Sequence, residues 1–224
     1  MRSALITCLV LLSSSALAGG TVTGQAAFSG EAPKPAAVNT GTDPACSGAR
    51  NDAVLLGKDG KTLRNVLVRV VDAPAEASAA TERPPVVIQQ RGCVYQPRVS
   101  GAVTGQQVLV GNGDEALHNV HAYQGKKTLL NRAQLPGAKE IRVALPAGAD
   151  VVQLKCDIHP WMLAHVVVSP SPYFAVTDAE GRFHIEGVPA GTWQLEAWHE
   201  QFGLKKGQVK VEEGKPATVS FSFP

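Results

Sequence analysis

Short β-branched runs separated by glycine, proline and Asx residues constrain the fold of this chain more than any other feature of its sequence. The clearest runs are residues 65–71, 107–110, 141–145 and 165–168. Helical periodicity is nearly absent, and turn residues such as those at 112–114 separate the runs. Many short strands with turn signals between them are typical of β-sandwiches and β-barrels. The sequence therefore predicts an all-β fold.

Two breaks interrupt the predicted strands. Residues 73–85 are rich in Ala, Pro, Glu and Ser, which is typical of a linker, and residues 169–172 contain two prolines. Proline is rare in central strands because it cannot donate a ladder hydrogen bond. The two breaks enclose a stretch of about 85–169, which we predict to be a domain of its own.

The segments outside these breaks share a recognisable pattern. Residues 176–195 contain an Asp-x-x-Gly turn, a strand, a Val-Pro-x-Gly turn and a second strand, and residues 20–24 read Gly-Thr-Val-Thr-Gly. This pattern resembles the carboxypeptidase regulatory-like, or transthyretin-like, β-sandwich. The resemblance implies one outer domain, 19–84 plus 170–224, with the middle domain 85–169 inserted into it. A simple tandem of β domains is the alternative.

The first residues have the organisation of a secretory signal peptide. A basic residue follows Met1, residues 4–12 are apolar, and a small-x-small sequence ends at Ala18. The apolar run is shorter than the roughly 20 residues that span a bilayer, and no later run is long enough. We expect residues 1–18 to be removed by cleavage near Ala18, which gives a periplasmic or secreted protein with no membrane span.

The charge balance excludes one class of partner. The chain has 21 Lys and Arg residues against 19 Asp and Glu residues, a formal net charge of +2. Proteins that bind nucleic acids normally present a strongly basic face. We therefore expect no nucleic-acid partner, and no attraction to an anionic membrane surface.

The cysteines form an odd set once the signal peptide is gone. The chain has 4 cysteines, and loss of Cys8 leaves Cys46, Cys93 and Cys156. Only Cys156 has metal-binding residue types near it in the sequence. The simplest solution is a Cys46–Cys93 disulfide, favoured in an oxidising compartment, with Cys156 as a thiolate ligand. The alternatives are two separate buried thiols, or a disulfide between Cys156 and one of the others.

Four residues form a candidate metal site. His118 follows the 112–114 turn, and Cys156, His159 and Met162 lie within seven residues of one another. Two imidazoles, a thiolate and a long axial thioether describe a type 1 copper site. Zinc accepts Cys and His but binds a thioether poorly, so Met162 argues against it. Taken singly, Met162 could fill a core and Cys156 could be a buried thiol, although Met162 is the only methionine left after residues 1–18.

These segments are similar to those of the cupredoxins, and most of all to amicyanins. The first motif is Leu-His-Asn-Val-His-Ala at 117–122, and the second is Cys-Asp-Ile-His-Pro-Trp-Met at 156–162, followed by three valines at 166–168. The resemblance implies a cupredoxin Greek-key β-sandwich with one copper ion bound by the four residues above. It also implies an outer-sphere electron carrier that cycles between Cu(II) and Cu(I) and serves an unidentified redox partner protein.

Asn119 and Asp157 each directly follow a predicted ligand in the sequence. In cupredoxins the asparagine after the first histidine ligand ties the two ligand segments together, which implies this role for Asn119; a plain turn residue is the alternative. Asp157 and Ile158 replace the Thr and Pro of amicyanins. The Asp157 carboxylate either binds the metal, changes the hydrogen bonding near the sulfur, or faces water. Hydrogen bonds around the ligands alter the redox potential of a metal site. Asp157 is therefore expected to make this site differ from those of its relatives.

The residues that flank the ligands suggest a contact surface. Leu117, Pro160 and Trp161 would form an apolar rim if His159 projects its imidazole edge to solvent as the electron port, although Trp161 would alternatively fill the gap between domains. His121 lies three residues after His118, hence on the opposite side of a strand, and is expected to point outward. The remaining histidines are expected to be surface residues or satisfied ones: His165, His184 and His199.

The sequence lacks the motifs of an enzyme. No Ser-His-Asp order, paired carboxylates or phosphate loop is present. A copper ion with four protein ligands has no open position for a substrate, so electron transfer is favoured over turnover. A copper-binding or copper-delivery protein without electron transfer is the main alternative, and a structural or adhesion module held together by its metal is a third.

Overall fold

The computed structural model describes residues 19–31, 33–34, 38–41, 43–50, 53–74, 83–148 and 150–224. These residues form seventeen strands and one short 3-10 turn, so the prediction of an all-β fold is confirmed. Among them, no helix has the length and apolar character needed to cross a membrane. The predicted signal peptide, 1–18, and most of the predicted linker lie outside the described residues.

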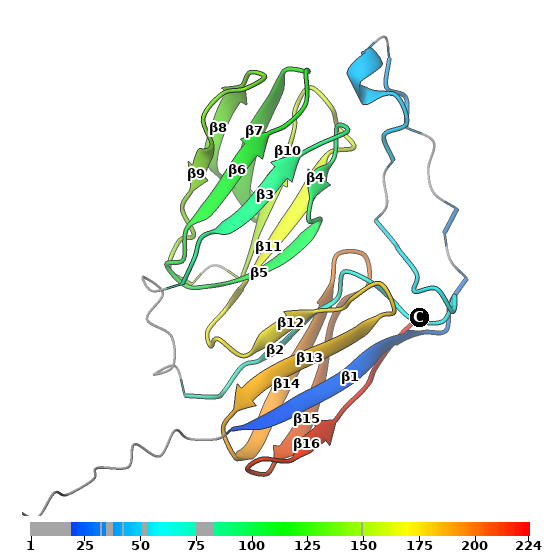
Figure 1. The fold of residues 1–224 in the computed structure, drawn as a ribbon, viewed down its shortest axis with the longest axis vertical. Helices are drawn as coiled ribbons and strands as arrows, with labels where there is room; N and C mark the ends of the chain where they lie inside the picture. Colours follow the sequence, from blue (N-terminus) through cyan, green and yellow to red (C-terminus); the bar gives the residue numbers. More distant parts are fainter. Residues whose placement is uncertain are drawn as a thin grey trace, which may run out of the picture.

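The middle part of the chain forms one pair of sheets, drawn in green and yellow in Figure 1. A five-stranded sheet has the order β5-β11-β10-β7-β8, and a four-stranded sheet has the order β4-β3-β6-β9. The strands of the first sheet are β5 (Val99–Val103), β7 (His118–Gln124), β8 (Lys127–Gln134), β10 (Val151–Lys155) and β11 (Leu163–Ser169). Those of the second are β3 (Val86–Gln90), β4 (Tyr95–Gln96), β6 (Val108–Asn112) and β9 (Ile141–Val143). Inward-facing side chains of both sheets share one hydrophobic core.

The outer parts of the chain form a second pair of sheets, below the first in Figure 1. One has the order β12-β2-β14-β15, and the other has the order β13-β1-β16 with β17 also paired to β1. The strands are β1 (Gly20–Phe28), β2 (Leu67–Val70), β12 (Phe174–Val176), β13 (Arg182–Val188), β14 (Gly191–His199), β15 (Gly203–Val211), β16 (Pro216–Thr218) and β17 (Phe221–Phe223).

Strands from both ends of the chain pair within these outer sheets. β1 pairs with β13, and β2 pairs with β12 and β14, so the whole middle unit lies between β2 and β12 in the sequence. The alternation of buried and exposed residues along β13 explains the pairing, because Phe183 and Ile185 both point into the outer core. From this pairing we propose the nested boundaries 19–84 plus 170–224 for the outer domain and 85–169 for the middle one.

Residues 43–50, in the segment between β1 and β2, lie away from the outer sheets at the upper right of Figure 1, whereas Leu63 and Val66 of the same segment belong to the outer core. The segment carries the 3-10 turn η1 (Pro44–Cys46), which begins after Asp43. The Cys46 sulfur is bonded to that of Cys93 across 47 residues of sequence, and Cys156 is a free, buried thiol. The predicted Cys46–Cys93 disulfide is therefore confirmed. It ties a segment of the outer chain to the middle unit.

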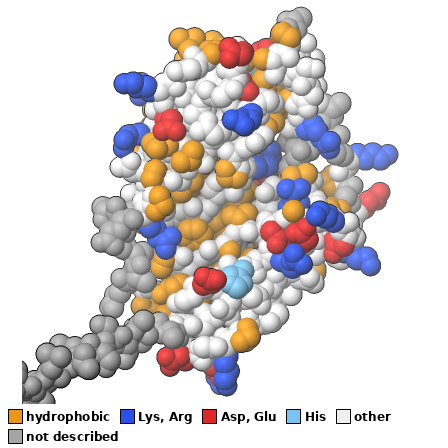
Figure 2. Space-filling model, viewed as in Figure 1, with side chains coloured by type: hydrophobic (Ala, Val, Ile, Leu, Met, Phe, Trp, Pro, Cys, Tyr) orange, Lys and Arg blue, Asp and Glu red, His pale blue; other side chains and the backbone are white. Residues whose placement is uncertain are grey.

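Polar contacts also join the two units. The Arg69 guanidinium on β2 donates to the Val168 carbonyl oxygen on β11 and pairs with Asp150 at 2.6 Å and with Glu196 at 2.7 Å. Basic and acidic side chains are interspersed on the face shown in Figure 2, in keeping with the near-neutral composition. A small apolar cluster around Leu67 lies between the units.

Two histidines at this junction correct the sequence-based expectation. His165 and His199 are buried, and neither His165 Nδ1 nor His199 Nε2 has a hydrogen-bond partner among the described residues. The prediction that they are surface or satisfied residues is therefore wrong in part: both are buried with one ring nitrogen lacking a partner among the described residues, whereas His165 Nε2 lies 3.2 Å from Gln153 Nε2 and His199 Nδ1 accepts from the Gln201 N–H. His184 is exposed and contacts Glu186, as expected.

Candidate metal centre

The ends of three neighbouring strands bring the predicted ligands together. His118 begins β7, Cys156 directly follows β10, and β10 pairs with both β7 and β11. His159 and Met162 lie in the turn that joins β10 to β11. Two backbone hydrogen bonds close this turn, from Met162 N–H to the His159 carbonyl at 2.9 Å and from Cys156 N–H to the Met162 carbonyl at 3.3 Å. The short spacing therefore places three predicted ligands in one tight turn.

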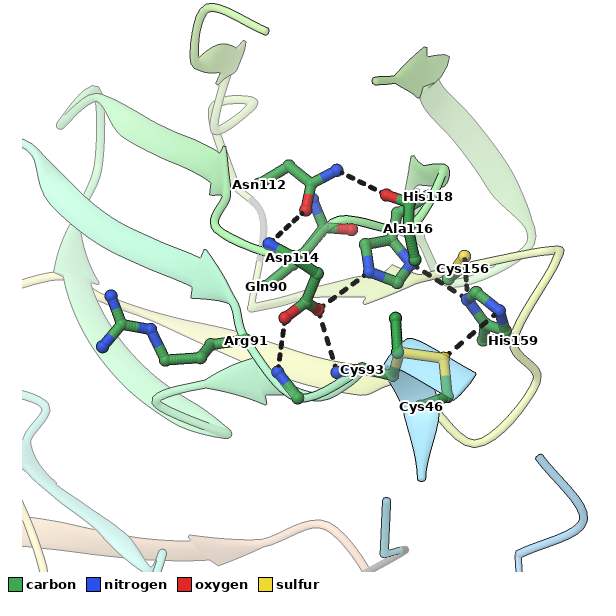
Figure 3. Close-up of polar contacts among 12 residues, drawn as sticks. Cys46, Gln90, Arg91, Cys93, Asn112, Asp114, Ala116, His118, Cys156 and His159 are labelled. Atoms are coloured by element: carbon green, nitrogen blue, oxygen red, sulfur yellow. Dashed lines mark hydrogen bonds and ion pairs between the residues drawn. A yellow bond between two sulfur atoms is a disulfide. The ribbon is translucent and has the colours of Figure 1, made fainter. Parts of the chain in front are cut away.

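The side chains of three predicted ligands converge on one point. Nδ1 of His118 lies 2.9 Å from Nδ1 of His159, and Cys156 Sγ lies 3.9 Å from the latter. The three donor atoms lie within 4.8 Å of one another and all three residues are buried. Metal–nitrogen and metal–sulfur bonds of about 2.0 and 2.3 Å fit these separations. Figure 3 shows the two imidazoles facing each other beside the sulfur.

Met162, the fourth predicted ligand, is fully buried. It belongs to the same core cluster as Cys156, and its backbone closes the ligand turn. This position is compatible with an axial thioether, and Met162 as a ligand stays a prediction.

The electrostatics of the centre favour a thiolate. Burial raises the pKa of the Cys156 thiol, but a hydrogen bond with His118 and several backbone N–H groups outweigh it, so that the pKa lies below its usual value. Asn119 N–H is one of these donors, at 3.5 Å from the sulfur. Burial lowers the pKa of His118, yet its bonds with Cys156 and Asp114 raise it on balance. Burial and the neighbouring His118 lower the pKa of His159. A thiolate facing two imidazoles is a donor set for a cation.

Two carboxylates that the sequence analysis did not single out lie behind the imidazoles. Asp114 Oδ2 lies 2.9 Å from Nε2 of His118, and it also accepts from the Cys93 N–H. Asp43 Oδ2 lies 3.5 Å from Nε2 of His159. A histidine ligand usually donates its second ring N–H to a carboxylate or carbonyl, which leaves the other nitrogen free for the metal. Both imidazoles are thus held with Nδ1 toward the common point.

Asn119 and Asp157 form a reciprocal pair between the two ligand segments. Asn119 Nδ2 donates to Asp157 Oδ2 at 3.0 Å, and Asp157 N–H donates to Asn119 Oδ1 at 2.6 Å. His121 and Asn131 also contact the carboxylate, at 2.9 Å each. Hydrogen bonds from His121, and then from Asn131 and Asn119, hold the pKa of Asp157 below its usual range against the effect of burial. Asp157 therefore acts through hydrogen bonds that tie the turn to β7 and β8.

The surroundings of His159 differ from the expectation. His159 is only 5 % exposed, because the Asp43–Cys46 segment lies against its Nε2 and Trp161 packs beside its ring. The expected solvent-facing edge of His159 is therefore wrong. Trp161 is half-buried and donates its indole N–H to the Cys93 carbonyl at 2.9 Å. We call residues 43–46 the cap.

The other residues of the predicted rim remain accessible. Leu117 is 43 % exposed and Pro160 is exposed; Ile158, which was not among the predicted rim residues, is also exposed, at 48 %. Each directly precedes or follows a predicted histidine ligand in the sequence. The apolar rim thus lies around the ligand turn, while the imidazole that it was expected to surround is covered.

Residues 159–224 match the family model of the carboxypeptidase regulatory-like domain. No curated protein matches the chain. A solved purple cupredoxin from Nitrosopumilus maritimus is 22 % identical over 38 % of this chain and 99 % of its own, with a TM-score of 0.33. Amicyanin from Paracoccus versutus is 19 % identical over 46 % of this chain and 97 % of its own, with a TM-score of 0.34.

A third solved structure is a copper-containing nitrite reductase from Thermus scotoductus. It is 24 % identical over 45 % of this chain and 27 % of its own, with a TM-score of 0.35. The two families that the sequence motifs resemble, the carboxypeptidase regulatory-like domain and the cupredoxins, are thus both among the matches.

Proposed function

We propose that this chain is an exported type 1 copper protein that carries electrons. One copper ion would be held by His118, Cys156, His159 and Met162. The observation that carries this proposal is the convergence of two Nδ1 atoms and one thiolate sulfur, all buried, at mutual distances that suit one ion. The export is proposed from the features of residues 1–18.

The donor set favours copper over other metals. Thiolate and thioether are soft donors that suit Cu(I), and imidazole binds both Cu(I) and Cu(II). Bound copper supplies a one-electron couple. The chain supplies the rigidity: Asp114 and Asp43 orient the imidazoles, and the Asn119–Asp157 pair holds the turn against β7. A centre held in this way changes little between the two oxidation states, which favours electron transfer.

The site is proposed to be non-enzymatic. Four protein donors leave no open coordination position for a substrate, unlike catalytic metal sites. Because the cap covers His159, the proposed route for electrons runs through the exposed rim of Leu117, Ile158 and Pro160. A redox partner protein would dock there, next to residues that adjoin the ligands in the sequence.

The test is a visible absorption spectrum after addition of Cu(II) to the metal-free protein. We expect an intense thiolate-to-copper band at one equivalent that disappears on reduction. The band should be absent in Cys156→Ser and kept in His184→Ala, a matched control at an exposed histidine outside the centre. A colourless protein that binds one zinc ion tightly would overturn the copper proposal.

Copper delivery is the second candidate, and one observation favours it. The Cys46–Cys93 disulfide lies directly against His159, so two further sulfurs that become thiolate donors on reduction are close to the proposed copper position. A reversible one-electron voltammetric wave with a stable Cu(II) state supports the electron carrier. Weak, exchangeable Cu(I) binding with no stable Cu(II) state supports delivery.

A further inference from the structure

We propose that reduction of the Cys46–Cys93 disulfide creates a second soft-metal site, a Cu(I) site made of Cys46 Sγ, Cys93 Sγ and His159 Nε2. This site lies behind the first one and shares only His159 with it. Cys156, His118 and Met162 take no part in it, so its formation does not depend on the function proposed above; only the transfer of Cu(I) between the two sites rests on that function.

The three donor atoms already lie together in the oxidised protein. Cys46 Sγ lies 3.6 Å from Nε2 of His159, and the two sulfurs and a ring nitrogen of His159 all lie within 4.8 Å of one another. All three residues are buried. Figure 3 shows the disulfide on the side of the His159 ring opposite Cys156. Opening the S–S bond frees two sulfurs that already face the imidazole.

The chemistry of this donor set selects a soft ion. Two thiolates and one imidazole make a three-coordinate set of the kind that suits Cu(I). Two buried thiolates without a counter-charge are unfavourable, because burying a charge is costly unless it is paired. Cu(I) that displaces the two thiol protons neutralises one of the two negative charges, and the soft Cu(I)–thiolate bonds favour the exchange of protons for the metal.

The shared imidazole makes the two sites alternatives. A neutral imidazole has one lone pair, so His159 binds at Nδ1 or at Nε2 but not at both. With the first site filled, Nδ1 is the ligand and Nε2–H points to Asp43. With the second filled, Nε2 is the ligand and the proton sits on Nδ1, which lies 2.9 Å from Nδ1 of His118. A change of tautomer at His159 would thus pass Cu(I) from one side of the ring to the other.

The redox step balances with a dithiol as reductant. The dithiol gives two electrons and two protons to the Cys46–Cys93 disulfide, which becomes two thiols, and the dithiol becomes a disulfide. Binding of Cu(I) then releases the two thiol protons to water. Copper itself is neither oxidised nor reduced in this sequence.

The experiment measures Cu(I) affinity in the Cys156→Ser variant, which lacks the thiolate of the first site. The protein is treated anaerobically with or without a phosphine reductant and titrated with Cu(I) against a chromophoric Cu(I) chelator. We expect one equivalent to bind after reduction, tighter than in the oxidised form by at least about 100-fold, since changes around metal ligands already alter affinity by roughly 10–100-fold.

The control is the same variant with Cys46→Ser and Cys93→Ser added, in which the phosphine should change nothing. Circular dichroism of the reduced protein, with and without Cu(I), should keep its strand signal. The proposal is overturned if reduction leaves Cu(I) affinity unchanged, if the strands unfold on reduction, or if the reduced pair prefers Zn²⁺ to Cu(I). The thiolate-to-copper band of the first site is a separate measurement in the unmodified chain.

Discussion

Cys46 lies 3.6 Å from Nε2 of His159, although 113 residues separate the two in the sequence. This contact places a covalently tied segment of the outer chain over a predicted copper ligand. It closes the side of the ring that was expected to meet a redox partner, and it leaves the rim around Leu117 as the accessible approach.

The first prediction concerns the cap. Replacing Cys93 with Ser opens a loop of 47 residues, and loss of such a crosslink should lower the free energy of unfolding by about 2–4 kcal/mol. Urea unfolding of the metal-free protein measures this. A Cys156→Ser variant, which breaks no crosslink, is the matched control. Equal stabilities of the Cys93→Ser variant and the unmodified chain would contradict the prediction.

The second prediction concerns the pair between the ligand segments. Asn119→Ala removes two hydrogen bonds to Asp157 and should destabilise the metal-free protein by about 1–3 kcal/mol, because an intramolecular hydrogen bond contributes about 0.5–1.5 kcal/mol. Asn131→Ala, which removes one exposed hydrogen bond to the same carboxylate and one acceptor of the Asn119 amide, should have a smaller effect. Chemical unfolding ranks the two variants. The reverse ranking would show that Asn119 does not hold the turn.

The third prediction concerns Asp114, which orients the His118 imidazole. Asp114→Ala should lower copper affinity by roughly 10–100-fold, the usual effect of losing a carboxylate behind a histidine ligand. Competition with a chelator, followed by the thiolate band, measures it. Glu115→Ala, at an exposed neighbouring carboxylate, should leave the affinity unchanged. If both variants bind copper alike, Asp114 is not an orienting residue.

The fourth prediction concerns pH. Burial, with Arg98 nearby, lowers the pKa of His165 and of His199 from 6.5 to about 4. Both are neutral in the folded state at pH values where the unfolded chain is already protonated. Stability is therefore fully present above pH 6.5 and falls as the pH drops toward 4, by up to about 3 kcal/mol for each histidine.

Urea unfolding between pH 7 and pH 4.5 measures this slope. A His199→Leu variant should show a shallower slope, whereas His184→Gln, at an exposed histidine, should keep the slope of the unmodified chain. A slope that is the same in all three proteins would mean that the buried histidines are not the groups that titrate.

Much of the centre could be predicted because its parts are local. Cys156, His159 and Met162 lie within seven residues, and a tight turn brings such near neighbours together in almost any fold. The cupredoxin resemblance implied that Asn119 ties the two ligand segments together, and its reciprocal bonds with Asp157 do so. The sequence left three roles open for the Asp157 carboxylate. The structure shows it hydrogen-bonded to Asn119, His121 and Asn131.

The two carboxylates behind the imidazoles, Asp114 and Asp43, could not be predicted from a motif in the sequence. In the sequence Asp114 belongs to the 112–114 turn, and nothing near Asp43 indicates a role at the centre. Their roles depend on which side of each imidazole faces the common point. Burial of His165 likewise depends on how the two units pack, because Trp198 of the outer unit lies against its ring, and the alternation of side chains along one strand gives no information about such a contact.

By itself, the sequence determined the β-strands, the turn that carries three predicted ligands, and the pairing of Cys46 with Cys93 as the simplest outcome of an odd cysteine count. These follow from residue types and short spacings, which act over a few residues of chain. Only the tertiary structure decided that residues 43–46 cover His159 and that the disulfide faces its second nitrogen. The physical reason is that such contacts join residues far apart in the chain, whose approach is set by the packing of two β-sandwiches and not by any local preference.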